Sequence, residues 1–166
     1  MILINFKEIT KKIFIRENFF LLIIIGIIFI LDRYSKIQII NNFNGTSFYI
    51  NDYLNFDLIW NTGIGFGLLS SDSSIYYNLI SCLIGLVIIY LIIVGINSNK
   101  FDKIAFSIIT GGALGNFYDR LVYQAVPDFV DFHYSNFHWF AFNVADIFIT
   151  VGIIAFIINE FFIKNK

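Results

Sequence analysis

The sequence FFLLIIIGIIFIL, at residues 19–31, is an unbroken apolar run that is followed directly by Asp32 and Arg33. Helix-favouring residues continue beyond these two charges to about Ile40. Because a helix needs roughly 20 residues to cross the hydrocarbon core of a bilayer, we expect a first membrane-spanning helix over residues 18–40. Asp32 then lies in the last third of this helix, inside the membrane.

The composition of the 166-residue chain is that of a membrane protein. The chain is 58% hydrophobic and 14% charged, with a mean hydropathy of +0.77, well away from the profile of soluble domains. A net charge of −1 gives no indication of a nucleic-acid partner. The single cysteine, Cys82, rules out a disulfide framework and a thiolate metal cluster. The length suits a single domain over residues 1–166.

Three further apolar stretches predict three more spans. Residues 73–96 carry no charge, whereas residues 104–123 and 140–162 contain charges that a plain anchor would lack. The expected fold is therefore an all-α membrane protein with four transmembrane helices. The connection at residues 41–72 alternates aromatic or branched residues with Asn and Asp, which predicts a small β-rich extracytoplasmic segment between the first two helices.

The distribution of Lys and Arg predicts the orientation of the chain. Basic residues occur before the first span, between the second and third, and after the fourth, at Lys7, Lys11, Lys12, Arg16, Lys100, Lys103, Lys164 and Lys166. The connections at 41–72 and 124–139 contain acidic residues but no Lys or Arg. We therefore expect both termini to be cytoplasmic.

Polar residues from four parts of the chain fall at one predicted depth, near the outer leaflet. They are Asp32, Asn116, Asp119, Arg120, Asp128, Asn143 and Asp146. A buried charge costs at least about 2.5 kcal/mol on insertion scales, so such groups need partners. Asp32 and Lys36 are four apart on one helix face, and Asn116, Asp119 and Arg120 also share a face, which predicts supporting ion pairs. The glycines of GGALG, residues 111–115, favour close helix packing.

Asp146 is different, because its own helix offers no cation. The nearest unpaired group of matching depth is an aspartate within residues 128–131. Two neighbouring carboxylates cannot both ionise easily, so one is expected to hold a proton. Such a pair can activate a water with one member and protonate a substrate with the other. These arguments do not separate Asp128 from Asp131.

The sequence gives less support to a metal site, a serine nucleophile or a non-enzymatic function. The sequence has no HExxH or GxSxG motif, and His133 and His138 are expected to be interfacial loop residues, because two histidines are too few for a metal site. Intramembrane charges also occur in proton-coupled transporters, although the discontinuous helices or inverted repeats typical of transporters are missing. A non-catalytic membrane assembly subunit is a further alternative. No metal or cofactor is expected.

Five short motifs, in order, resemble those of the lipoprotein signal peptidase (signal peptidase II) family of bacterial membrane aspartyl proteases. They are DRYSK (32–36), NTGIGFG (61–67), GGALGNFYDR (111–120), VPDFVDF (126–132) and FNVADIFI (142–149). Two residues depart from the family pattern: Gly65 stands where Ala is usual, and Pro127 stands where Val is common.

The resemblance implies that Asp128 and Asp146 are catalytic and that Asp131 is only a neighbour. The supporting or substrate-binding residues that it implies are Asp32, Lys36, Asn61, Gly63, Asn116, Asp119, Arg120, Asn143 and Ala145. The implied substrate is a diacylglyceryl-modified prolipoprotein, cut before its lipidated Cys without a metal or cofactor. The resemblance also implies contact with membrane lipid, no obligatory protein partner, and a bacterial cytoplasmic (inner) membrane location with the active site near the outer leaflet.

Overall fold

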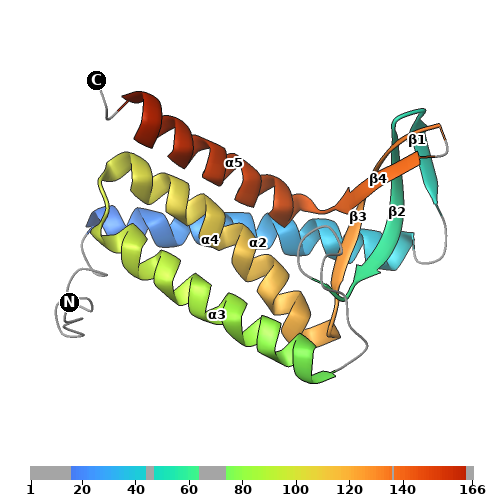
Figure 1. Cartoon of the computed structure of the whole chain (residues 1–166), viewed down its shortest axis with the longest axis horizontal. Helices are drawn as coiled ribbons and strands as arrows, with labels where there is room; N and C mark the ends of the chain where they lie inside the picture. Colours follow the sequence, from blue (N-terminus) through green and yellow to red (C-terminus); the bar gives the residue numbers. More distant parts are fainter. Residues whose placement is uncertain (1–15, 44–46, 64–73, 136, 164–166) are drawn as a thin grey trace.

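The computed structural model describes residues 16–43, 47–63, 74–135 and 137–163. Within these ranges the protein is mostly helical and carries one antiparallel sheet (Figure 1). The helices are α2 (Arg16–Asn42), α3 (Ser74–Asn97), α4 (Lys100–Tyr123) and α5 (Val144–Ile158), which continues as the π-helix η2 (Asn159–Ile163). The strands are β1 (Phe48–Asn51), β2 (Leu54–Asn61), β3 (Val126–Tyr134) and β4 (Phe137–Phe142).

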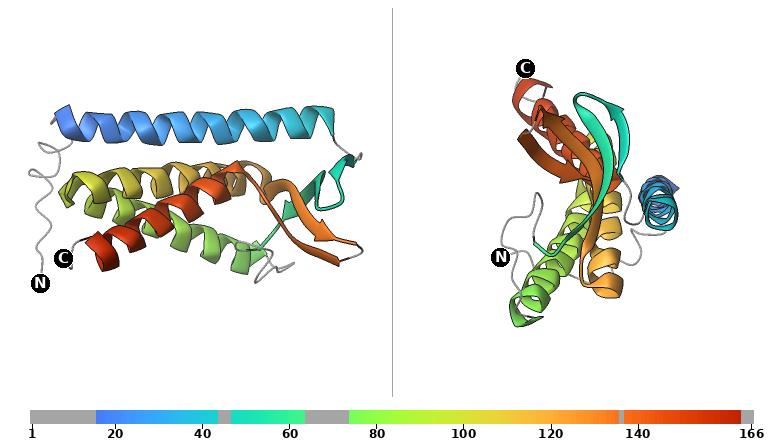
Figure 2. Two further views of the ribbon diagram at one scale, coloured as in Figure 1. Left: turned by 90° about the horizontal axis from the view of Figure 1, so that it is seen from above. Right: turned by 90° about the vertical axis from the view of Figure 1, so that its right-hand side faces the viewer.

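The sheet lies at one end of the helical bundle, next to the end of α4 and the start of α5 (Figures 1 and 2). The start of α2 and the end of η2 lie at the opposite end. A chain whose two ends lie on the same side of a membrane requires this arrangement. Most of the basic residues used to predict that orientation lie outside the described residues.

The four strands follow the order β1-β2-β3-β4, and all neighbours are antiparallel. Strands β1 and β2 confirm the predicted β-rich segment between the first two helices. Strand β3 and the first half of β4 lie in the connection at 124–139, where a loop was expected, so the predicted all-α fold was incomplete. The aromatic and branched residues of FHWFAF and VPDFVDFHY favour strands, and pairing with β2 completes the sheet.

Helix α4 packs against each of the other three long helices. Its glycines face their closest neighbours: a Cβ at Gly111 would meet Ile28 of α2, one at Gly112 would meet the backbone of Ala145, and one at Gly115 would overlap the Asp32 carboxylate. The prediction that the GGALG segment allows close packing is therefore confirmed.

The distribution of polarity is inverted relative to a soluble protein. The largest fully buried side chains are Lys36, Asn143, Thr110, Asp32, Asp119 and Pro127. By contrast, α3 exposes apolar side chains such as Leu83 (59%) and Leu86 (60%). Because a soluble protein buries its apolar and exposes its charged side chains, this pattern indicates an apolar surrounding.

Two described helical segments, Tyr77–Asn97 and Val144–Ile163, are long and apolar enough to cross a membrane by length and composition. The last helix begins at Val144, four residues after the predicted start of the fourth span at residue 140. Phe140 and the two residues after it belong to β4 instead. Asn143 has an extended backbone and caps α5 with its side chain, which sets the start of the helix.

Candidate active site

Asp128 lies in β3, opposite Ile59 of β2, and is only 3% exposed. Both of its carboxylate oxygens accept a hydrogen bond from a side-chain amide. Asn61 Nδ2 donates to Oδ2 at 2.8 Å, and Asn143 Nδ2 donates to Oδ1 at 2.6 Å. Burial, and next the carboxylate of Asp146, raises the pKa of Asp128 from 3.8 to about 6, although the two amides act in the opposite direction.

Asp146 lies in the first turn of α5, where it takes part in a capping box with Asn143. The Asn143 backbone N–H donates to Asp146 Oδ2 at 3.1 Å, and the Asp146 N–H donates to Asn143 Oδ1 at 3.1 Å. Asn116 Nδ2 donates to Asp146 Oδ1 at 2.8 Å. These bonds fix the direction of the Asp146 carboxylate before any substrate is present.

Asp128 and Asp146 line the same cavity, which has a volume of about 330 Å³. The cavity is also lined by Asn61, Asn116 and Arg120. The sequence therefore folds so that two carboxylates from different elements line one cavity, as expected for an acid–base pair.

Lys36 is the centre of a buried network behind this cavity. Its Nζ is fully buried and donates to Asp32 Oδ2 at 2.8 Å and to Asn116 Oδ1 at 2.8 Å. It also forms an ion pair with Asp119 Oδ2 at 2.7 Å. Since Asn116 bonds Lys36 through its oxygen and Asp146 through its amide nitrogen, Lys36 determines which way the Asn116 amide faces.

Asp32 connects the same network to the start of α5. Its Oδ1 accepts a hydrogen bond of 3.0 Å from the Ala145 backbone N–H, and its other oxygen bonds Lys36. A carboxylate at a helix N-terminus also interacts favourably with the helix dipole. The predicted pair of Asp32 and Lys36 is confirmed, and Ala145 contributes through its backbone.

The partners of Asp119 and Arg120 come largely from outside their own helix. Asp119 pairs with Arg33 and Lys36 of α2. Arg120 donates from one nitrogen to the Asn116 carbonyl at 3.1 Å and from another to the Gly63 carbonyl at 2.9 Å. The shared helix face that the sequence suggested is thus used for contacts between helices, and Arg33 was missed because its acceptor lies 86 residues away.

Residues 61–63, Asn61, Thr62 and Gly63, are the described part of the NTGIGFG motif. The Gly63 N–H donates to Asn61 Oδ1 at 2.8 Å, which leaves the Asn61 amide nitrogen directed at Asp128. Gly65, one of the two departures from the family pattern, lies outside the described residues. Pro127, the other, is fully buried and pairs with Trp60 across the sheet.

Asp131 does not join the site. Its carboxylate contacts His138 at 2.8 Å and His133 at 3.4 Å on the β3–β4 hairpin. Sequence spacing alone does not distinguish Asp131 from Asp128, but these contacts do. Of these two aspartates, only Asp128 lines the cavity.

Comparisons with known proteins agree with this geometry. Residues 24–162 match the family described as Signal peptidase (SPase) II. The lipoprotein signal peptidase of Pelagibacter ubique is 50% identical over 154 residues, covering 90% of this chain and 93% of the relative. That of Francisella tularensis subsp. novicida is 43% identical over 121 residues, covering 70% and 75%. That of Dichelobacter nodosus is 35% identical over 147 residues, covering 87% and 94%.

Two solved structures, both described as a bacterial membrane enzyme, have the same fold. One, at 2.3 Å resolution, is 30% identical with a TM-score of 0.67, covering 88% of this chain and 92% of its own. The other, at 1.9 Å, is 29% identical with a TM-score of 0.68, covering 87% and 94%. The extent of these similarities shows that the chain belongs to the signal peptidase II family.

Proposed function

We propose that this chain is a membrane aspartic endopeptidase that removes signal peptides from diacylglyceryl-modified prolipoproteins, cutting before the lipidated Cys. The observation that carries the proposal is the shared cavity of Asp128 and Asp146, with amide donors on both carboxylates. The relatives named lipoprotein signal peptidase support the substrate class. They do not favour a transporter or an assembly subunit.

In the proposed mechanism Asp128 and Asp146 share one proton. The ionised carboxylate takes a proton from a water, whose oxygen bonds to the scissile carbonyl carbon, while the protonated carboxyl donates its proton to the carbonyl oxygen. The resulting diol collapses: its hydroxyl returns a proton to one carboxylate, the carbon–nitrogen bond breaks, and the leaving amine takes a proton from the other. The pair ends with one proton, as it began.

The amides hold the two carboxylates without blocking them. Each carboxylate oxygen has two lone pairs, and the described hydrogen bonds use one on each oxygen of Asp128. The remaining lone pairs are available to a water. Asn61, Asn116 and Asn143 are therefore positioning residues in this proposal, because each acts through an aspartate.

An apolar pocket of about 410 Å³ beside the site supports a lipidated substrate. Asp146 lies on its wall, and the other lining residues are Phe132, Trp139, Phe140, Phe142, Ile147, Thr150 and Val151. An acyl chain can bury apolar surface there while the peptide reaches the carboxylates. We further propose that the chain crosses the inner membrane four times with both termini in the cytoplasm, which sets the sheet and the site at the outer leaflet.

The test is a cleavage assay with the detergent-purified protein and a diacylated prolipoprotein, followed by gel shift. Asp128→Asn and Asp146→Asn should each reduce the rate at least about a hundredfold, because each removes one half of the acid–base pair. Asp57→Asn is the matched control, since Asp57 is an exposed aspartate in β2 of the same sheet. Full cleavage by either of these two variants would show that Asp128 and Asp146 are not the catalytic pair. No cleavage by the wild type of a confirmed lipidated substrate would contradict the proposed function.

A further inference from the structure

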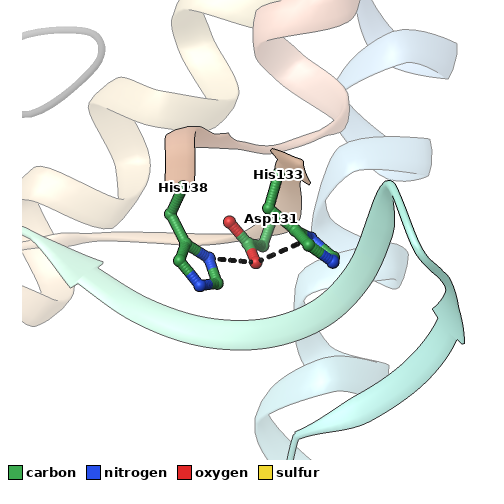
Figure 3. A group of neighbouring side chains, drawn as sticks. All are labelled: Asp131, His133 and His138. Carbon is green, nitrogen blue, oxygen red and sulfur yellow. Dashed lines mark hydrogen bonds and ion pairs between the residues drawn. The ribbon is translucent and has the colours of Figure 1, made fainter. Parts of the chain in front are cut away.

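A second cluster of titratable side chains lies on the β3–β4 hairpin (Figure 3), and none of its members lines the cavity of Asp128 and Asp146. Asp131 and His133 are two residues apart in β3 and therefore share a face of the strand. His138 of β4 is the cross-strand partner of His133. The sheet register thus collects one carboxylate and the two histidines of the chain at one place.

The potential ligand atoms of this cluster lie close together. Asp131 Oδ2 is 2.8 Å from His138 Nδ1 and 3.4 Å from His133 Nδ1, and one ligand atom from each residue lies within 4.8 Å of the others. Bonds of about 2.0 Å to a tetrahedral zinc ion place neighbouring ligand atoms about 3.3 Å apart. The two distances to Asp131 Oδ2 lie on either side of this value, so small side-chain movements would let the three residues share a metal ion.

Burial of the cluster gives an independent reason to expect a ligand. Asp131 is 3% exposed and His133 is 8% exposed. Within the described part of the chain, His133 Nδ1 is buried and makes no hydrogen bond, since its 3.4 Å contact with Asp131 Oδ2 does not have hydrogen-bond geometry. A buried polar atom without a hydrogen bond is unusual, and a bound ion is one group that satisfies such an atom.

We propose that Asp131, His133 and His138 bind a divalent transition-metal ion, with Zn²⁺ as the expected ion. Two neutral imidazoles and one carboxylate are ligands that zinc prefers, whereas calcium and magnesium prefer oxygen ligands. The His138 side chain is 61% exposed, so the ion can enter from the surface and complete its coordination with water. The metal would join β3 to β4 at a buried position.

The position of this site indicates a structural role. Asp128 precedes Asp131 by three residues in β3, and Asn143 directly follows β4. These two residues, at the base of the hairpin, are joined by the 2.6 Å hydrogen bond. A metal that links the two strands would hold this base together without touching the cavity. The inference does not depend on the proposed function, because metal binding is measured without cleavage.

The test is a calorimetric titration of Zn²⁺ into protein that carries no histidine tag, in detergent, after chelator treatment and dialysis. The wild type should bind one Zn²⁺ per chain. His138→Gln should weaken binding at least about tenfold, since it removes a ligand. His138 is exposed, so this variant should fold, and circular dichroism checks that it does. Asp57→Asn removes an exposed carboxylate from the same sheet and should bind as the wild type does.

A second measurement uses the wild type alone. Co²⁺ should give the intense visible absorption of a four- or five-coordinate ion, and Zn²⁺ should abolish that absorption by competition. The proposal is overturned if the wild type binds no Zn²⁺, if His138→Gln binds as tightly as the wild type, or if Asp57→Asn weakens binding as much as His138→Gln. A Co²⁺ spectrum of the hydrated ion would overturn it equally.

Discussion

The side-chain amide of Asn143 lies 2.6 Å from Asp128 Oδ1. The same residue also caps α5 and bonds Asp146 through its backbone N–H. One side chain thus orients one aspartate, and its backbone orients the other. The relative position of the two carboxylates therefore depends on how Asn143 joins β4 to α5.

This double role predicts different results for two substitutions at Asn143. Asn143→Ala removes both the cap and the amide donor, so it should lower the unfolding free energy by about 1 kcal/mol and the cleavage rate by roughly tenfold or more. Asn143→Ser keeps a capping oxygen but cannot reach Asp128 as an amide does. It should recover most of the stability and little of the activity. Thermal unfolding and cleavage assays measure the two effects. If Asn143→Ser recovered stability and activity equally, the cap and the amide donor would not have separate roles.

The raised pKa of Asp128 predicts a pH-dependent stability. A carboxyl whose pKa is higher in the folded protein than in the unfolded chain stabilises the fold at low pH, and this contribution is lost as the pH rises. A rise from 3.8 to about 6 corresponds to about 3 kcal/mol. As the pH rises from about 4 to about 8, the unfolding free energy of the wild type should therefore fall by up to about 3 kcal/mol more than that of Asp128→Asn. Parallel stability curves for the two proteins would show that Asp128 titrates normally.

The buried amine of Lys36 predicts a large loss of stability in Lys36→Met. The substitution leaves Asp32 and Asp119 without their shared cation, and breaking a buried ion pair costs about 3–5 kcal/mol. Thermal unfolding in detergent measures the effect. Lys100→Met is the control, because Lys100 is exposed at the start of α4 and its change should stay within about 0.5 kcal/mol. Similar losses for the two variants would argue against the network.

The glycines give a matched pair of substitutions. In Gly115→Ala the new methyl group would overlap the Asp32 carboxylate, so we expect a loss of about 1–3 kcal/mol and reduced cleavage as α2 moves away from α4. In Gly26→Ala the new methyl group meets nothing within 4 Å. That variant should be as stable as the wild type, or more stable by up to about 1 kcal/mol. The opposite order of stabilities would contradict the close packing described here.

Chelation should separate the proposed metal site from the proposed chemistry. Removing the ion from Asp131, His133 and His138 should lower the unfolding temperature, since a ligand at a hundred times its Kd stabilises by about 2.7 kcal/mol. Cleavage by the folded enzyme should persist, because the two carboxylates act without a metal. Loss of cleavage while the circular dichroism spectrum is unchanged would show that the metal takes part in the reaction.

The sequence predicted local relationships better than distant ones. The pair of Asp32 and Lys36 follows from helix spacing alone and is present in the structure. The pairing of Asp119 with Arg33 depends on which faces of α2 and α4 meet, and no local pattern records that choice. The cluster of Asp131, His133 and His138 needed the β3–β4 register, which the prediction of a loop at 124–139 had hidden. Charge and depth in the sequence point to Asp146 and to either Asp128 or Asp131, and at that level only the family resemblance distinguishes Asp128.

The charges of the buried network also bear on the number of protons in the proposed active site. Asp32 and Asp119 are balanced by Arg33 and Lys36 in the helices. Arg120 is the remaining cation and lines the cavity with Asp128 and Asp146. The whole assembly is therefore electrically neutral when the two aspartates carry a single proton between them. In an apolar medium any other number of protons leaves an unbalanced charge, so the lipid environment itself should favour the state from which the proposed reaction starts.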